Sequence, residues 1–122
     1  MTKGNSSCPC PDPPAVVPAQ AVDLADLVDY AGGAIVSKTI AESGAGTMTL
    51  FAFDAGQGLS EHTSPFDAVV QVVEGEGAFI IDGEMKTAKE GEMIIMPANI
   101  PHDVQAADQP FKMLLTMIRS EV

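Results

Sequence analysis

Two stretches of the chain decide its fold: GQGLSEHTSPFDAVVQVVEG at residues 56–75 and GEMIIMPANIPH at residues 91–102. Each begins with a glycine, contains a short apolar run and carries one of the chain's two histidines, His62 or His102. Glycine tolerates the positive φ angles of tight turns, and apolar runs rich in β-branched residues favour strands. Both stretches therefore predict strands bounded by turns.

The chain from residue 34 onward has the pattern of an all-β protein. Short runs of β-branched and aromatic residues are separated by Gly, Pro, Asn or Asp. Asp82-Gly83 is a signal for a two-residue type I′ hairpin, because glycine accepts the positive φ that this turn requires. Many short strands without a long helical period predict an antiparallel sandwich or barrel, of which the jelly roll is one form. The expected strands are 34–41, 47–53, 67–73, 77–81, 93–96, 102–106 and 111–119.

The N-terminal part of the chain differs in composition from the rest. Residues 1–20 contain five prolines and small polar residues, which predicts a flexible arm. Residues 22–29 combine valines, leucines and an alanine with three aspartates, which predicts a short amphipathic helix leading into the barrel. We expect residues 21–122 to form a single domain. Cys8 and Cys10, the only cysteines, are too close in sequence to join distant parts of a core, and no basic neighbour favours a reactive thiol.

The charge balance excludes several classes of function. Six Lys and Arg residues against 17 Asp and Glu give a formal net charge of −11, which repels nucleic acid and anionic membranes. The first ten residues contain no apolar segment of the kind that directs secretion, and the apolar runs are too short to span a bilayer. We therefore expect a cytoplasmic protein that does not bind nucleic acid or membranes.

The spacing of the two histidine stretches resembles the two motifs of the cupin superfamily. In that family the first motif is Gly, five residues, HxH, three or four residues, Glu, six residues, Gly; the second is Gly, five residues, PxG, two residues, His. His62 and His102 stand at matching positions, whereas Ser64 replaces the second His, Ala68 replaces the Glu and Asn99 replaces the Gly of PxG. The resemblance implies an antiparallel jelly-roll β-barrel, a double-stranded β-helix, in which the two histidines share an interior pocket. Only two of the family's four metal ligands, His62 and His102, are present in this sequence.

The resemblance implies a small single-domain cupin that binds a small molecule inside the barrel. His62, Ser64 and His102 would be the polar contacts, and the apolar interior would suit a small apolar or aromatic ligand. One alternative is a metal-dependent enzyme of the dioxygenase, isomerase or decarboxylase type, with His62 and His102 on a weakly held divalent metal. The other is a structural or regulatory dimer in which the barrel is only a scaffold. Cupins are commonly dimers, so a homodimer is expected, with the N-terminal arm or strand 34–41 covering a neighbour's sheet edge.

A third metal ligand is hard to find in the sequence. Asp67 and Glu61 each lie one residue from a motif position, and an odd offset along a strand turns a side chain to the opposite face. The six methionines after Met1 could supply thioether ligands for copper alongside imidazole, although methionine more often fills irregular cores. The pattern therefore favours binding of an organic ligand over a metal centre.

Overall fold

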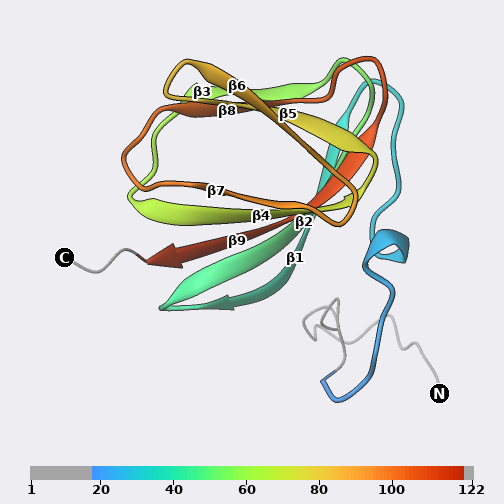
Figure 1. Cartoon of the computed structure of the whole chain (residues 1–122). Coiled ribbons are helices and arrows are strands. Elements are labelled where there is room, and N and C mark those ends of the chain that lie inside the picture. Colours follow the sequence, from blue (N-terminus) through green and yellow to red (C-terminus); the bar gives the residue numbers. More distant parts are fainter. Residues whose placement is uncertain (1–17, 120–122) are drawn as a thin grey trace, which may run out of the picture.

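Two antiparallel β-sheets face each other in this chain, of which the computed structural model describes residues 18–119. Residues 1–17, with Cys8, Cys10 and most of the expected arm, lie outside the described residues. The strands are β1 (Ile35–Ser43), β2 (Gly46–Phe53), β3 (Gly58–His62), β4 (Phe66–Glu74), β5 (Glu76–Ile81), β6 (Glu84–Lys89), β7 (Met93–Met96), β8 (His102–Gln105) and β9 (Phe111–Arg119). One sheet has the order β1-β2-β9-β4-β7 and the other β3-β8-β5-β6. Figure 1 shows the two layers, with the β1–β2 hairpin at one edge of the five-stranded sheet. The expected jelly-roll barrel is confirmed.

Two strands were not among the expected ones, and both expose most of their residues. In β3 Leu59 is the one residue that is not fully exposed, and in β6 only Ala88 is buried. Neither strand therefore has the apolar alternation from which a half-buried strand is predicted. The hairpin joining β5 to β6 was expected, and Asp82 and Gly83 have φ angles of 53° and 83°, as a type I′ turn requires.

The core between the sheets is aromatic at its centre. Phe53, Phe79 and Phe111 are completely buried. The rings of Phe53 and Phe111 stack with centroids 4.8 Å apart, and Phe79 meets Phe111 edge to face at 6.1 Å. Each such side chain contributes roughly 1.5–3 kcal/mol when removed from water. These three rings form the centre of the packed core between the two sheets.

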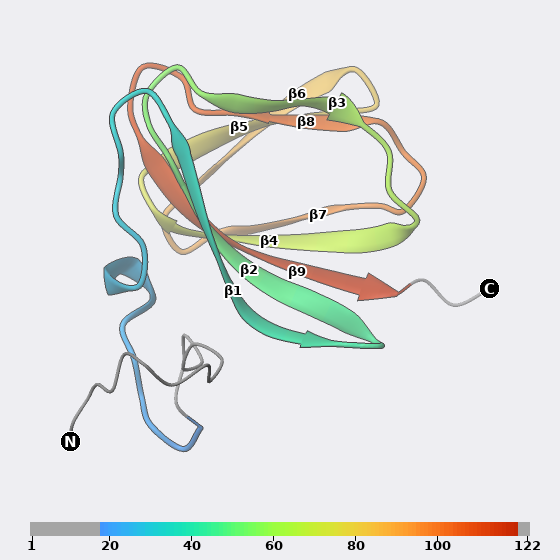
Figure 2. The ribbon, with the colours of Figure 1, turned by 180° about the vertical axis from the view of Figure 1, so that it is seen from behind.

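A second apolar cluster lies on the outer face of the five-stranded sheet. Leu50 and Ala52 from β2 and Leu114 from β9 are buried there beneath Val28. Strand alternation explains this arrangement, because neighbours of inward-facing residues such as Phe53 and Met113 must point outward. Figure 2 shows the N-terminal segment beside this sheet and away from the four-stranded one. The segment before β1 therefore serves as a cover for one sheet.

The expected helix over residues 22–29 is reduced to one 3₁₀ turn, η1 (Leu24–Asp26). Asp23 caps it, accepting a hydrogen bond from the backbone N–H of Ala25. An α-helix would direct the carbonyl of Ala25 to the N–H four residues on, but this carbonyl accepts a 2.6 Å bond from Nζ of Lys112 instead. So short a segment cannot offset the cost of helix nucleation alone, and packing on the sheet determines its path. None of the helices within residues 18–119 could cross a membrane.

Candidate functional site

The two histidines lie side by side at one end of the four-stranded sheet. His62 ends β3, His102 begins β8, and the two are cross-strand partners in the antiparallel pair. Their ring centroids are 4.5 Å apart and the rings meet edge to face at 69°. His102 is only 3% exposed, whereas His62 is open to solvent. The pair thus joins a buried imidazole to one at the surface.

Both imidazoles are held through the same ring nitrogen. Nδ1 of His62 lies 2.7 Å from the carbonyl oxygen of Ser60, and Nδ1 of His102 lies 3.0 Å from that of Ile100. A carbonyl can only accept, so each Nδ1 carries the proton and donates it. In the neutral rings Nε2 therefore keeps its lone pair. This arrangement fixes ring orientation and leaves one acceptor nitrogen on each histidine for a ligand.

The loops that carry the two motifs are tied together by two hydrogen bonds. The N–H of Asn99 donates to the carbonyl of Ser64 at 2.7 Å, and the N–H of Ala98 donates to Oδ1 of Asp67 at 2.9 Å. Asn99 has a φ of 65°, in the left-handed region that asparagine enters more readily than most residues. Asn99 can therefore replace the glycine of the family pattern without disturbing the turn before His102.

Ser64 lies in the turn before β4. Its Oγ accepts a hydrogen bond of 3.1 Å from the N–H of Phe66. Serine often makes such local bonds to the backbone two residues ahead. The hydroxyl proton can still be donated to a ligand, so a contact from Ser64 stays a prediction, but the side chain has a structural role of its own.

The position at which the family pattern has a glutamate is apolar in this structure. Ala68 is 3% exposed, and its cross-strand partners are Met96 on β7 and Met117 on β9. Asp67 is engaged with the loop of Ala98. Asp103 follows His102 directly and so points to the opposite face of the sheet. Thus neither acidic neighbour replaces the lost ligand.

The donor set does not fit the metal centre that the family resemblance implies. Within residues 18–119, no group of three or more His, Cys, Asp or Glu side chains is placed to hold a metal ion. Two neutral imidazoles supply neither the third ligand nor the negative charge of a facial triad.

Three cavities lie away from the histidines. Two cavities of about 310 Å³ each flank the β1–β2 hairpin, and a third of about 200 Å³ lies beside β5 and β6. His62, Ser64 and His102 line none of these three. His102 is buried and His62 is exposed, so the pair reaches from the interior to the surface, and an interior pocket shared by the two histidines stays a prediction.

A polar cluster that the sequence did not predict lies on the outer face of the five-stranded sheet. Lys112 is 6% exposed, donates to the carbonyl of Ala25 and lies 4.9 Å from the ring centroid of Tyr30. The Tyr30 hydroxyl donates a 2.6 Å hydrogen bond to Glu74. Burial raises the pKa of that hydroxyl above its ordinary value, and the hydrogen bond and negative charge of Glu74 raise it further. These contacts fasten the N-terminal segment to the sheet.

Comparisons with known proteins agree with this architecture. The family model described as a cupin domain matches residues 49–117. A Streptococcus pyogenes protein of unknown function is 33% identical with a TM-score of 0.81, over 88% of this chain and 94% of its own. A cupin 2 conserved barrel domain protein from Leptotrichia buccalis is 42% identical with a TM-score of 0.78, over 80% of this chain. This match covers 47% of the Leptotrichia chain, about half its length. Comparison with curated proteins gives no match.

Proposed function

Because the chain belongs to the cupin family, we propose that it binds a small molecule at the mouth of its barrel, with His62 and His102 as the principal polar contacts. The observation that carries this proposal is the contact between the two imidazoles, with ring centroids 4.5 Å apart. Both Nδ1 atoms are bonded to backbone carbonyls, so both Nε2 atoms can accept from a hydroxyl or an acid proton. A ligand with such a donor and an apolar body matches this environment.

The difference in burial between the two rings supports different roles for His62 and His102 in ligand binding. His102 is shielded from solvent, so a hydrogen bond to it forms in a less polar environment and is stronger than one at the surface. His62 is exposed and can adjust to ligands of different size. We therefore expect His102 to contribute most of the affinity and His62 to contribute to selectivity.

A thermal-shift and NMR screen of small acids, sugars and aromatic compounds tests the proposal. Binding should shift the imidazole resonances of His62 and His102, and a His62→Ala, His102→Ala double variant should lose it. Gln105→Ala is a matched control, since Gln105 is an exposed polar residue on β8 three positions from His102. A ligand that binds the double variant as well as the wild type would exclude the histidines from the site, and a screen without any ligand would favour a scaffold role.

Metal-dependent catalysis has less support, because the third ligand position is occupied by buried Ala68. The proposal therefore requires no metal, and a metal-dependent activity would need ligands in addition to the two histidines.

A second copy of this chain is the partner we propose. β1 is an edge strand of the five-stranded sheet, so one side of its backbone has no neighbouring strand among the described residues. Unpaired edges favour association unless they are protected. Light scattering at micromolar concentration should give the mass of a dimer, and a monomer would overturn the proposal.

A further inference from the structure

One cavity of about 310 Å³ lies beside the β1–β2 hairpin and carries opposite charges on its walls. Its lining residues include Glu42 on β1, which carries a carboxylate, and Arg119 at the end of β9, which carries a guanidinium. Thr47, Phe66 and Met117, all half-buried, form the surface between them. The volume is at the lower end of the range for small-molecule sites. This cavity combines a cation, an anion and an apolar floor.

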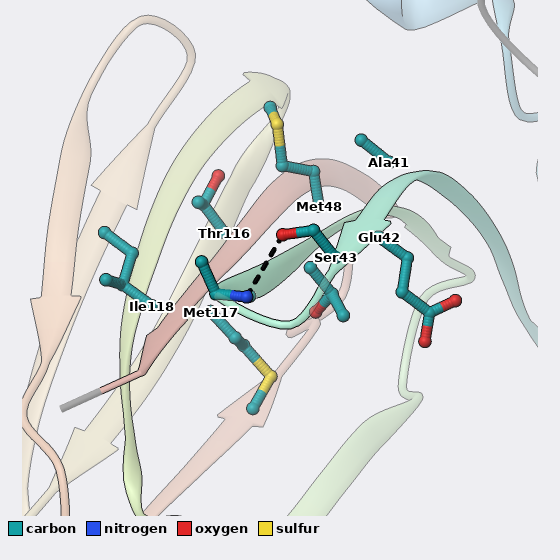
Figure 3. A pocket seen from close by; sticks show the side chains of 10 residues that line it. Ala41, Glu42, Ser43, Met48, Thr116, Met117 and Ile118 are labelled. Atoms are coloured by element: carbon teal, nitrogen blue, oxygen red, sulfur yellow. Dashed lines mark hydrogen bonds between the residues drawn. The ribbon is translucent and has the colours of Figure 1, made fainter.

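Strand register explains why these side chains share one face. Glu42 pairs with Thr47 across β1 and β2, and Thr47 pairs with Met117 across β2 and β9. Phe66 pairs with Arg119 across β4 and β9. Direct cross-strand partners point to the same side of a sheet. Figure 3, a close view of the neighbouring cavity, shows Met117 and Glu42 directed away from Met48 and Thr116.

Arg119 is held in a fixed orientation. Its backbone N–H donates to the carbonyl of Ala45 at 3.0 Å, and its Nε donates to the carbonyl of Gly44 at 3.0 Å. The guanidinium carbon lies 5.8 Å from the ring centroid of Phe66. A guanidinium carries five N–H donors, so the two terminal nitrogens keep a fork of donors suited to a carboxylate. Arg119 is the only arginine of the chain.

Glu42 and Arg119 do not neutralise each other. The one ion pair closer than 4 Å among the described residues joins Lys86 and Glu84 on β6. Glu42 lies two strands from β9, and Arg119 lies two residues beyond the row of Glu42, so their Cα atoms are roughly 12 Å apart. Two opposite charges carried by well-separated backbone positions, with apolar surface between them, match a molecule that carries both charges at its ends.

The net charge of the protein does not oppose such a ligand. A net charge of −11 repels small anions and attracts cations without selectivity. A zwitterion has no net charge, so the long-range field neither repels nor concentrates it, and local contacts alone decide its binding. We propose that this cavity binds a small zwitterion whose ammonium and carboxylate groups are joined by a short apolar chain, with Glu42 holding the ammonium and Arg119 the carboxylate.

This site is independent of the histidine pair, because His62 and His102 do not line the cavity. Isothermal titration or ligand-observed NMR with 6-aminohexanoate tests it on the full chain. Saturable binding to the wild type is expected, and hexanoate and hexylamine, which each lack one charge, should bind about tenfold more weakly. Absence of saturable binding, or equal binding of all three compounds, would overturn the proposal.

Two variants assign the contacts. Glu42→Gln and Arg119→Gln should each weaken binding of 6-aminohexanoate about tenfold. Glu84→Gln and Lys86→Gln remove the same charges from exposed β6 and should leave binding unchanged. If Arg119→Gln loosens the hairpin, Glu42→Gln still decides, because no hydrogen bond or ion pair of the Glu42 side chain is found within residues 18–119. Unaltered binding in Glu42→Gln contradicts the proposal, and a His62→Ala, His102→Ala variant should still bind.

Discussion

The N–H of Asn99 donates a 2.7 Å hydrogen bond to the carbonyl of Ser64, and this bond joins the loop before β8 to the loop before β4. Because His102 follows the first loop and His62 precedes the second, the bond helps to keep the two histidines opposite each other. The geometry depends on the φ of 65° at Asn99, which few L-residues adopt without strain.

The effect of an Asn99 substitution on the free energy of unfolding should therefore depend on whether the new residue tolerates a positive φ, and not on the size of its side chain. Asn99→Gly should leave the free energy of unfolding nearly unchanged, because glycine adopts a positive φ readily. Asn99→Val should lower it by about 1–2 kcal/mol, because a β-branched side chain is strained there. Urea denaturation of the three proteins measures the difference. Equal stability of the glycine and valine variants would show that the turn does not constrain this loop.

Gly77 allows β5 to pack closely against the ring of Phe111. A Cβ at position 77 would lie 2.6 Å from two ring carbons of Phe111, which is completely buried and cannot move aside. Gly77→Ala should therefore destabilise the protein by about 1–3 kcal/mol through overpacking. Gly32→Ala is the matched control, because a Cβ added at position 32 would have no other atom within 4 Å. Thermal denaturation compares the two, and a stable Gly77→Ala variant would mean that the sheets can separate to accommodate a methyl group.

The strands that bury an apolar face could be predicted from the sequence, and the exposed ones could not. β7 was predicted with its observed limits and β9 likewise, because their apolar residues are consecutive or alternate. β3 was missed because four of its five residues are exposed, although its last residue is His62. The motif spacing located His62 although the residue periodicity did not. The spacing is informative because turns fix the positions of glycines such as Gly56 and Gly91, whose φ angles are 79° and 87°.

Contacts between distant segments lay beyond the sequence pattern. Lys112 and Ala25 are 87 positions apart, and no local signal indicates that the side chain of one meets the carbonyl of the other. The same contact explains why the predicted helix over 22–29 shrinks to one turn. The sequence did contain one indication of this contact, which is the position of Lys112 between the apolar residues Phe111 and Met113. A cation on a covered sheet face needs a partner.

The Tyr30 hydroxyl predicts a loss of stability at high pH. Its pKa in the folded protein is raised above the ordinary value of 10.0, by burial first and then by Glu74. A group with a raised folded pKa contributes stability fully below its unfolded pKa and loses that contribution as pH rises toward the folded pKa. The free energy of unfolding of the wild-type protein should therefore fall as pH rises above 10. Tyr30→Phe should show a smaller fall, and urea denaturation from about pH 8 to about pH 11 compares the two proteins.

At about pH 8 the same substitution should cost about 1–2 kcal/mol, because the 2.6 Å hydrogen bond to Glu74 is lost. If the free energy of unfolding of Tyr30→Phe depends on pH as in the wild type, ionisation of Tyr30 is not coupled to unfolding. Tyr30 then could not cause the loss of stability at high pH.

Lys112 should be necessary for attachment of the N-terminal segment. Lys112→Met keeps an unbranched side chain but leaves the Ala25 carbonyl without its charged donor and removes the cation from the Tyr30 ring. Loss of a hydrogen bond to a charged group lowers stability by roughly 1.5–3 kcal/mol. Limited proteolysis should cut more rapidly within residues 18–34, whereas exposed Lys38→Met on β1 should not change the rate. Equal cleavage rates in the two variants would assign the attachment to the apolar contacts of Val28 alone.

Restoring the two replaced motif residues should strengthen metal binding at the histidine pair. A Ser64→His, Ala68→Glu variant adds a third imidazole and the anionic ligand to His62 and His102, and the carboxylate offsets the charge of a divalent ion. Isothermal titration with Zn²⁺ should show at least about tenfold tighter binding than in the wild type, in which only two imidazoles are available. Gln71→Glu, at an exposed position of β4, adds the same charge elsewhere and should not increase affinity. Equal Zn²⁺ affinity in wild type and double variant would mean that positions 64 and 68 do not face the histidine pair, and stoichiometric metal in the purified wild type would contradict a two-ligand site.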